Sequence, residues 1–353
     1  MLSGRNSLVK TGTFDLIVQS IQQQNIKVYA EKIEMEPNPS LIDTITGLYH
    51  KKNIDVVVAI GGGSVLDAGK AVSAMLPLNE PVKTYLEGVG TKKPSGQKIP
   101  FIAIPTTAGT GSETTKNAVI SEIGNDGYKK SLRHDKYIPD IALIDPFLTI
   151  NCPKEITAAS GMDAFTQLLE AYLSDQCDEM TSSLIFSALK AINRSLVKTY
   201  KDGRDIVART DMSYAAMISG IGLANAGLGV IHGFASPLGG YFKIPHGVVC
   251  GTLMAPCNKY TVNHLFETNK TNSLKKYQTI AGIFLNSPNP VLDDIKRFIE
   301  YLYLLTEDLK IPVLEKYGIT ENDFDKIINE TSNKNNPVKL ENQDLLNILS
   351  ERL

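Results

Sequence analysis

The sequence predicts two domains, an α/β domain over residues 1–150 and an all-α domain over residues 151–353. Three observations lead to this prediction. In the first part of the chain, short apolar runs alternate with helical patterns, which indicates a mostly parallel sheet with helices on both faces. After Pro153 the strand patterns fade and long amphipathic segments follow. A chain of 353 residues is also long enough to bury two substantial cores.

The clearest strand of the first domain covers residues 55–60. This short β-branched apolar run is typical of a strand buried on both faces. Further strands are expected at 26–30, 98–104 and 142–144, and helices at 13–24 and from about residue 40 to residue 52.

The start of the chain departs from this pattern. A doubly wound domain should begin with a strand, but only Met1 and Leu2 precede the turn-like segment Ser3–Ser7. We therefore expect the first strand to be missing from this sequence or to be supplied in an unusual way.

The second domain is expected to be helical throughout. The helices are predicted at about 155–174, 178–198, 205–232, 274–285, 290–308 and 321–331. Residues 212–242 contain no Asp, Glu, Lys or Arg, yet they include seven glycines and several polar residues. A membrane span needs about 20 predominantly apolar residues, so we interpret this segment as a buried helix followed by a loop.

Composition excludes several classes of protein. The net charge is −2 and there is no basic run, which argues against a nucleic-acid partner. The four cysteines form no CxxC motif, as expected for reduced thiols in a cytoplasmic protein. The first residues contain no apolar segment typical of a signal peptide. We expect a cytoplasmic homo-oligomer, a dimer, with neither nucleic-acid nor membrane partners.

Three consecutive glycines follow the strand at 55–60. They allow a sharp turn and a close approach of the backbone to a ligand, and the helix that begins after them directs free N–H groups and a positive dipole toward an anion. A phosphate or pyrophosphate is the expected ligand, although an ordinary glycine-rich βα turn would look similar. The candidate cofactor-binding residues of this turn are Gly61, Gly62, Gly63, Ser64 (a possible helix cap) and Asp67.

A second polar loop, Pro105–Thr115, follows the strand at 98–104. Eight of its residues are Gly, Ser or Thr, whose N–H and hydroxyl groups could bind phosphate, ribose or a nicotinamide amide. Open α/β sheets bind ligands at the carboxyl ends of their strands, which favours a binding loop over a merely solvated one. The candidates here are Thr106, Thr107, Gly109, Thr110 and Ser112.

Polar residues of the helical part suggest a metal site. Asp163 and Gln167 share one face of the helix at 155–174, which would fit either a solvated surface or a polar cleft. His232 and His246 lie 14 residues apart in the most apolar region of the chain. A lone buried histidine is commonly a core residue, but one carboxylate and two imidazoles would suit a catalytic metal with an open coordination position.

These motifs resemble the iron-containing (group III) alcohol dehydrogenases, in the superfamily that includes glycerol dehydrogenase and dehydroquinate synthase. The resemblance covers nearly the whole chain, and the loop Pro105–Glu113 is its most specific part. The segments that carry it are Gly61–Asp67, Pro105–Glu113, Gly161–Ala164, Gly229–His232, Pro245–Gly247 and Asn336–Leu340. The family implies a Rossmann-like N-terminal domain, an all-helical C-terminal domain, and NAD(P)-dependent interconversion of alcohol and aldehyde in the cleft between them.

The resemblance also assigns residues. Asp163, His232 and His246 are similar to the metal-binding residues of the family, and Gln167 is a further candidate ligand because many members have histidine there. Many members also have histidine where this chain has Ser236. One carboxylate and two imidazoles without a thiolate suit either zinc or iron. The surviving set resembles the zinc site of glycerol dehydrogenase, so we expect zinc slightly ahead of iron.

The expected activity is a metal-dependent, NAD(P)-linked oxidation of a small alcohol to its aldehyde or ketone, or the reverse. The cofactor is NADP or NAD, with NADP favoured because Ser3–Ser7 contains Arg5 and no acidic residue to bind the ribose 2′-hydroxyl. A lyase or cyclase of the dehydroquinate synthase type would use the same apparatus. A nucleotide-binding protein that has lost its metal is the third alternative.

Overall fold

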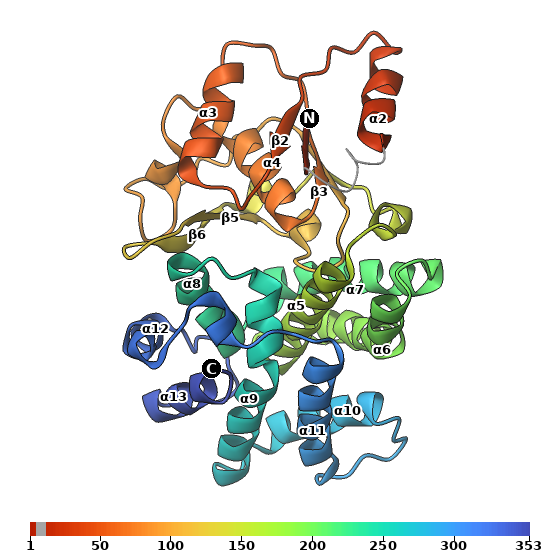
Figure 1. The fold of residues 1–353 in the computed structure, drawn as a ribbon, viewed down its shortest axis with the longest axis vertical. Coiled ribbons are helices and arrows are strands. Elements are labelled where there is room, and N and C mark those ends of the chain that lie inside the picture. Colours follow the sequence, from red (N-terminus) through yellow and green to blue (C-terminus); the bar gives the residue numbers. More distant parts are fainter. Residues whose placement is uncertain (5–11) are drawn as a thin grey trace.

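The computed structural model describes residues 1–4 and 12–353. Arg5, on which the expected NADP preference rests, lies outside the described residues. The strands occupy one half of the molecule and helices α5 to α13 occupy the other, with the C-terminus among the helices (Figure 1). The predicted α/β architecture followed by helices is confirmed.

The central sheet has five parallel strands in the order β2-β1-β3-β4-β7. Its strands are β1 (Leu2–Gly4), β2 (Glu31–Ile33), β3 (Val57–Gly61), β4 (Phe101–Pro105) and β7 (Ile141–Ala142). Val57, Ala59 and Ile60 are buried, as the apolar run predicted. Helices α2 (Thr13–Gln22), α3 (Pro39–Tyr49) and α4 (Gly63–Met75) complete this half.

Two predictions about the first strands of this sheet are wrong. The first strand is not missing, because Leu2–Gly4 forms β1 and pairs with both β2 and β3. The strand expected at 26–30 lies instead at Glu31–Ile33, where Leu2 pairs with Glu31. Ile26 is 54% exposed, so its apolar side chain does not mark a buried strand. Pairing with β1 therefore places this strand on a segment that is less apolar than residues 26–30, which the local sequence pattern indicated.

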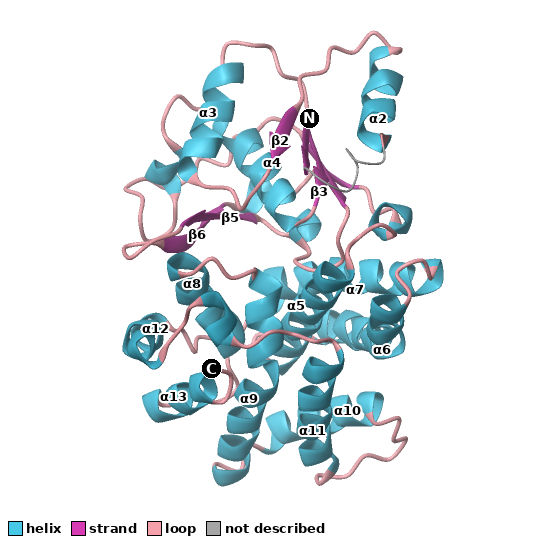
Figure 2. Ribbon diagram, viewed as in Figure 1, coloured by secondary structure: helices cyan, strands magenta, loops and turns pink. Residues whose placement is uncertain are grey.

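An antiparallel hairpin that the sequence reasoning did not predict connects the two halves. It consists of β5 (Asn117–Glu122) and β6 (Tyr128–Arg133). One strand packs against α4 and the other against α8 of the helical half. Figure 2 shows the hairpin between the sheet and the helices.

The helical half contains most of the predicted segments with small shifts at their ends. Its helices are α5 (Lys154–Leu173), α6 (Glu179–Lys201), α7 (Ile206–Ala226), α8 (Val230–Tyr241), α9 (His246–Glu267), α10 (Thr271–Phe284), α11 (Asp294–Asp308), α12 (Phe324–Glu330) and α13 (Asn342–Ser350).

Within the described residues, no single helix is long and apolar enough to cross a membrane. Helices α7 and α8 together would be long and apolar enough, but the chain bends by 100° at the break between them.

The prediction of one helix over 205–232 followed by a loop is wrong. Gly227 has φ 71°, a left-handed conformation that suits glycine, and it ends α7. A new helix, α8, begins at Val230 and carries His232. Helix α9 was also missed, because Gly247, Gly251 and Pro256 lie within its span and disfavour helix locally.

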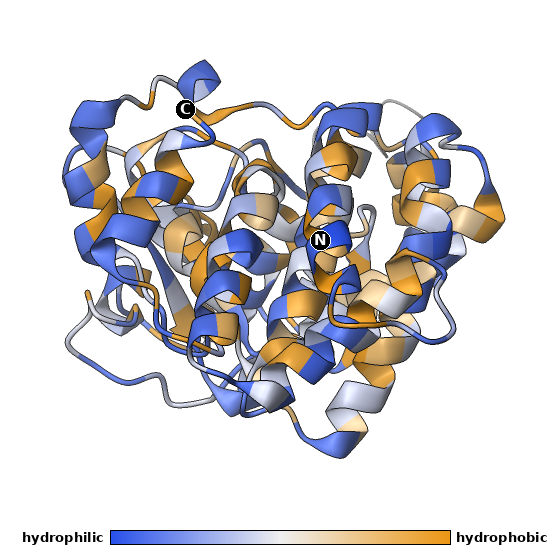
Figure 3. Cartoon of the chain, turned by 90° about the horizontal axis from the view of Figure 1, so that it is seen from below, coloured by the Kyte–Doolittle hydropathy of each residue, from blue (hydrophilic) through white to orange (hydrophobic). Residues whose placement is uncertain are grey.

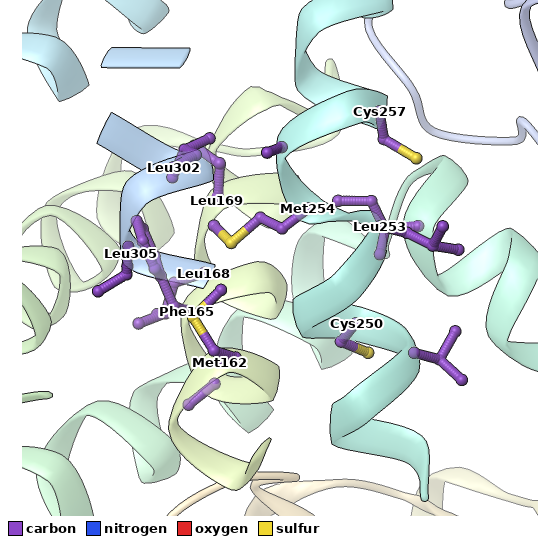
Figure 4. Packing of buried hydrophobic residues seen from close by; sticks show 14 of the residues in the cluster. Met162, Phe165, Leu168, Leu169, Cys250, Leu253, Met254, Cys257, Leu302 and Leu305 are labelled. Carbon is purple, nitrogen blue, oxygen red and sulfur yellow. The ribbon is translucent and has the colours of Figure 1, made fainter. Parts of the chain in front are cut away.

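Helix α5 forms the centre of the helical core and packs against α6, α7 and α9. Phe165 of α5 is fully buried and stacks on Phe284 at a centroid separation of 4.6 Å. Figure 4 shows Met254 of α9 pointing toward α5, and Cys250 and Cys257 on the same helix. Figure 3, the view from below, shows helices that carry both hydrophilic and hydrophobic residues, as amphipathic helices do.

Candidate functional site

The topology of the sheet indicates where a ligand would bind. β1 and β3 are neighbours, with β2 beyond β1 and β4 beyond β3, so the strand order reverses between them. Ligands of open α/β sheets bind outside the carboxyl ends of the strands at such a reversal. The strands end there at Gly4 and Gly61.

The glycine turn lies at this position. β3 ends at Gly61 and α4 begins at Gly63, with Gly62 as its N-cap and no capping side chain. The cap expected from Ser64 is therefore wrong, because Ser64 already lies inside the helix. No side chain caps the first turn of α4, and a helix start with free N–H groups is the arrangement that binds phosphate groups.

The second loop packs closely on the turn. A Cβ on Gly62 would lie 3.3 Å from Oγ1 of Thr107, and one on Gly63 would lie 2.7 Å from Cγ2 of Thr110. The backbone N–H of Thr106 donates to the carbonyl oxygen of Gly61 over 2.9 Å. The two glycine-rich segments therefore form one continuous backbone surface.

Two of the candidate cofactor-binding residues bind each other. Oγ of Ser112 donates to Oδ1 of Asp67 over 2.6 Å. Nζ of Lys70, fully buried, donates to the carbonyl oxygen of Ser112 over 2.8 Å and to that of Asn117 over 2.8 Å. Burial raises the pKa of Asp67 and lowers that of Lys70 to about 8. This network holds the second loop against α4.

Another candidate of the second loop, Gly109, is buried and packs against Ser160 of α5.

The three predicted metal ligands meet from three helices. Asp163 lies on α5, His232 on α8, and His246 is the first residue of α9. Oδ1 of Asp163 is 3.4 Å from Nε2 of His232 and 3.5 Å from Nε2 of His246. Their rings lie 5.3 Å apart between centroids. A carboxylate oxygen and two imidazole nitrogens therefore converge on one point.

Glycines on α9 allow this convergence. A Cβ on Gly247 would come within 2.2 Å of the carbonyl oxygen of Ala159, and one on Gly251 within 3.1 Å of Cβ of Met162. Helices α5 and α9 can therefore approach closely, which brings Asp163 beside His246.

Glu170 orients His232. Nδ1 of His232 donates to Oε2 of Glu170 over 2.6 Å, and the N–H of Ile231 donates to Oε1 over 2.7 Å. One carboxylate thus fixes the imidazole, directs its Nε2 toward Asp163, and caps the start of α8. Carboxylate–histidine pairs of this kind hold metal-binding imidazoles in place. Glu170 was not among the candidate residues that the sequence indicated.

Cys250 was missed altogether. Its sulfur lies 3.6 Å from Nε2 of His232 and 3.8 Å from Nε2 of His246. The spacing of four residues from His246 would have indicated this position if helix α9 had been predicted.

Electrostatics within the cluster fit a cation. Burial alone would raise the pKa of Asp163, but His246 and His232 lower it to about 2. Burial lowers the pKa of His246 to about 4. Although burial opposes it, Cys250 and Glu170 raise the pKa of His232. The cluster thus holds an ionised carboxylate and attracts a positive charge, which a metal ion would supply in place of a proton.

Gln167 connects the cluster with the second loop. Its Nε2 donates to Oδ1 of Asp163 over 3.1 Å and to the carbonyl oxygen of Thr110 over 3.3 Å. Its Oε1 has no hydrogen-bond partner among the described residues. The glycine-rich surface and the candidate metal-binding side chains are therefore parts of one site.

An ion pair on the hairpin side completes the surroundings. Nζ of Lys129 lies 3.0 Å from both carboxylate oxygens of Glu36. Oγ of Ser236 donates to the carbonyl oxygen of Lys129 over 3.3 Å. After burial and Asp163, the charge of Lys129 is the next influence on the pKa of His246, which it lowers. No local sequence pattern indicated this pair, because its members lie 93 residues apart.

Comparison with known proteins gives a consistent result. The chain is 32% identical to alcohol dehydrogenase 4 of Saccharomyces cerevisiae over 336 residues, which are 93% of this chain and 83% of the relative. It is 30% identical to 1,3-propanediol dehydrogenase of Klebsiella pneumoniae over 90% of this chain and 80% of the relative. The solved alcohol dehydrogenase from Oenococcus oeni superposes with a TM-score of 0.87 at 29% identity, covering 100% of this chain and 91% of that one.

Two family profiles match nearly the whole chain. The profile described as iron-containing alcohol dehydrogenase matches residues 1–146. The C-terminal profile of the Fe-containing alcohol dehydrogenase family matches residues 157–353. Members of this family use a nicotinamide cofactor and a divalent metal, and the convergent Asp163, His232 and His246 fit such a metal. This chain belongs to the iron-containing alcohol dehydrogenase family and is a metal-dependent, NAD(P)-linked alcohol oxidoreductase.

Proposed function

We propose that Asp163, His232 and His246 hold one divalent metal, and that the segments 61–67 and 105–112 bind the dinucleotide beside it. The substrate is a small alcohol or the corresponding aldehyde or ketone. The observation that carries this proposal is the convergence of Oδ1 of Asp163 and two imidazole Nε2 atoms at 3.4 and 3.5 Å, directly beside the glycine-rich surface.

The residues of the chain then have separate tasks. A bound metal supplies Lewis acidity toward the substrate oxygen, and the nicotinamide supplies or accepts the hydride. Glu170 fixes the tautomer of His232, with the proton on Nδ1. The free N–H groups at the start of α4 orient the pyrophosphate. Gln167 links the carboxylate of Asp163 to the second loop through its two hydrogen bonds.

The two alternative activities differ in measurable ways. An enzyme of the dehydroquinate synthase type regenerates its cofactor and produces no net NAD(P)H turnover. A nucleotide-binding protein without metal would bind dinucleotide but purify without zinc or iron. The set of metal-binding atoms argues against the metal-free alternative. The synthase type would use the same apparatus, and the similarity to dehydrogenases argues against it.

The decisive experiment combines two measurements on the purified protein. Metal analysis should find close to one zinc or iron per chain. A panel of small aldehydes should then consume NADH or NADPH, which is followed by absorbance. Metal-free protein, or the absence of net cofactor consumption with every aldehyde tested, would contradict the proposal.

Several further expectations from the sequence stay predictions. They are the division into residues 1–150 and 151–353, a homodimeric state, a cytoplasmic location, and the expectation of neither nucleic-acid nor membrane partners. The match of separate profiles to residues 1–146 and 157–353 supports a division near residue 150.

A further inference from the structure

Cys250 lies among the three proposed metal ligands. It follows His246 by one turn of α9, so the two side chains project from the same face of the helix. Its sulfur lies 3.6 Å from Nε2 of His232 and 3.8 Å from Nε2 of His246. The candidate ligand atoms of these residues and of Asp163 all lie within 4.8 Å of one another.

Four of the distances among these atoms match those expected in a tetrahedral zinc centre. Ordinary zinc bond lengths place a ligand oxygen about 3.3 Å from a ligand nitrogen, and a ligand sulfur about 3.6 Å from a ligand nitrogen. The carboxylate oxygen of Asp163 lies 3.4 and 3.5 Å from the two imidazole nitrogens. The sulfur of Cys250 lies 3.6 and 3.8 Å from the same nitrogens. The longer pair of distances belongs to sulfur, as its longer metal bond requires.

The hydrogen bonding of the imidazoles supports the same interpretation. Nδ1 of His232 donates to Glu170, so its Nε2 faces Asp163 and Cys250. In the neutral imidazole, which is the form that binds metals, this nitrogen presents a lone pair beside the carboxylate oxygen. A metal ion satisfies both of them together with the sulfur.

We propose that Cys250 is a fourth protein ligand of the metal, so that the set is one carboxylate, two imidazoles and one thiolate. This inference rests on the proposed metal centre. On coordination the thiol loses its proton to solvent, because the thiolate is the ligand form of cysteine. Thiolate ligation shifts the preference of the site from iron toward zinc, which binds mixed sulfur and nitrogen ligands well.

Gln167 is the competing fourth ligand, and its hydrogen bonds argue for a different role. Its Nε2 donates to the same oxygen of Asp163 that faces the imidazoles, and an amide N–H₂ group has no lone pair for a metal. Gln167 therefore positions Asp163 from outside the coordination sphere. The two assignments differ in whether sulfur is bound to the metal.

Cobalt(II) reports bound sulfur directly. The metal-stripped full-length protein is titrated with cobalt(II), and its absorption spectrum is recorded. We expect one cobalt per chain and a thiolate-to-cobalt charge-transfer band in the near ultraviolet. This band should be lost in Cys250→Ser, while the weaker visible bands from the remaining ligands persist. Gln167→Ala should keep the charge-transfer band.

Cys257→Ser is the matched control, because Cys257 is a second buried thiol on the same helix (Figure 4). It should leave the charge-transfer band unchanged. Cobalt bound by the wild type without this band would overturn the role of Cys250 and leave the other three ligands in place. A wild-type protein that binds no cobalt would overturn both this inference and the proposed metal centre.

A second measurement needs no variant and covers the case in which Cys250→Ser does not fold. X-ray absorption of the zinc-loaded wild type should show one sulfur at about 2.3 Å together with nitrogen and oxygen at about 2.0–2.2 Å. A shell made of nitrogen and oxygen alone would overturn the proposal.

Discussion

His246 contributes one of the converging nitrogens, and its removal should abolish the metal site. His246→Ala takes away an imidazole and leaves Asp163 buried with one fewer partner. We expect bound metal to fall well below one per chain and kcat/KM to fall about 100-fold or more, since metal catalysis contributes several kcal/mol. Metal analysis and steady-state kinetics test this together.

His264→Ala is a suitable control for this variant. His264 lies at the other end of α9 and binds Asp344 and Glu267 instead. It should keep its metal and its activity. Full metal occupancy in His246→Ala would remove His246 from the ligand set.

The variant Gly62→Val tests whether the glycine turn binds the cofactor. A valine there would place its branched side chain against Thr107, since even a Cβ would lie 3.3 Å from Oγ1. We expect the Kd for the dinucleotide to rise about tenfold or more, a cost of about 1.4 kcal/mol, with metal content unchanged. Gly124→Val is the control, because a Cβ at Gly124 meets nothing within 4 Å. Unchanged dinucleotide affinity in Gly62→Val would mean that the turn does not bind the pyrophosphate.

Arg5 tests the choice between NADP and NAD. An arginine can pair with a 2′-phosphate, whereas a carboxylate repels it and accepts hydrogen bonds from the 2′-hydroxyl. We expect kcat/KM to be higher with NADPH than with NADH in the native protein, and Arg5→Asp to reverse this preference. A native preference for NADH that the substitution leaves unaltered would show that Ser3–Ser7 does not bind this part of the ribose.

At the scale of elements, the loop after β4 depends on charges buried against α4. Glu113 is 4% exposed, and burial raises the pKa of its carboxyl from 4.5 to about 7. Because folding raises the pKa of Glu113, its contribution to the free energy of unfolding is fully present below pH 4.5. That contribution is lost as the pH rises through about 7. The loss amounts to about 3 kcal/mol.

Glu113→Gln should remove this loss, because an amide carries no charge at any of these pH values. We expect its melting temperature to exceed that of the wild type at pH 8 by several degrees, and the difference to shrink toward pH 4.5. Thermal melts across this range measure the effect. Glu300→Gln, on an exposed position of α11, should show no comparable trend. A melting-temperature difference for Glu113→Gln that is constant with pH would contradict the ionisation argument.

For the whole molecule, the proposed metal would connect three helices that are distant in sequence. Asp163, His232 and His246 lie on α5, α8 and α9, and a bound metal stabilises the folded state alone. At a free metal concentration of 1,000 Kd this stabilisation is about 4 kcal/mol. A chelator should therefore lower the melting temperature of the wild type and leave that of His246→Ala unchanged. Equal effects of the chelator on both proteins would show that the stabilising metal binds elsewhere.

Much of the fold and site was predictable because it is encoded locally. The apolar run before Gly61, the consecutive glycines and the polar loop after residue 104 specify strand, turn and ligand surface within a few residues. The same holds for helix α5, whose polar face carries Asp163. His232 and His246 were recognisable as candidate ligands because their motifs resemble those of a known family.

The tertiary structure decided what depends on pairing between distant segments. β1 has three residues and exists because both β2 and β3 pair with it. Helix α9 forms despite Pro256 and its glycines, because packing against α5 outweighs weak local propensity. Once α9 is a helix, Cys250 faces the metal-binding atoms, and the break at Gly227 lets Glu170 reach His232. A sequence pattern records neighbours along the chain, whereas these contacts join residues that only packing brings together.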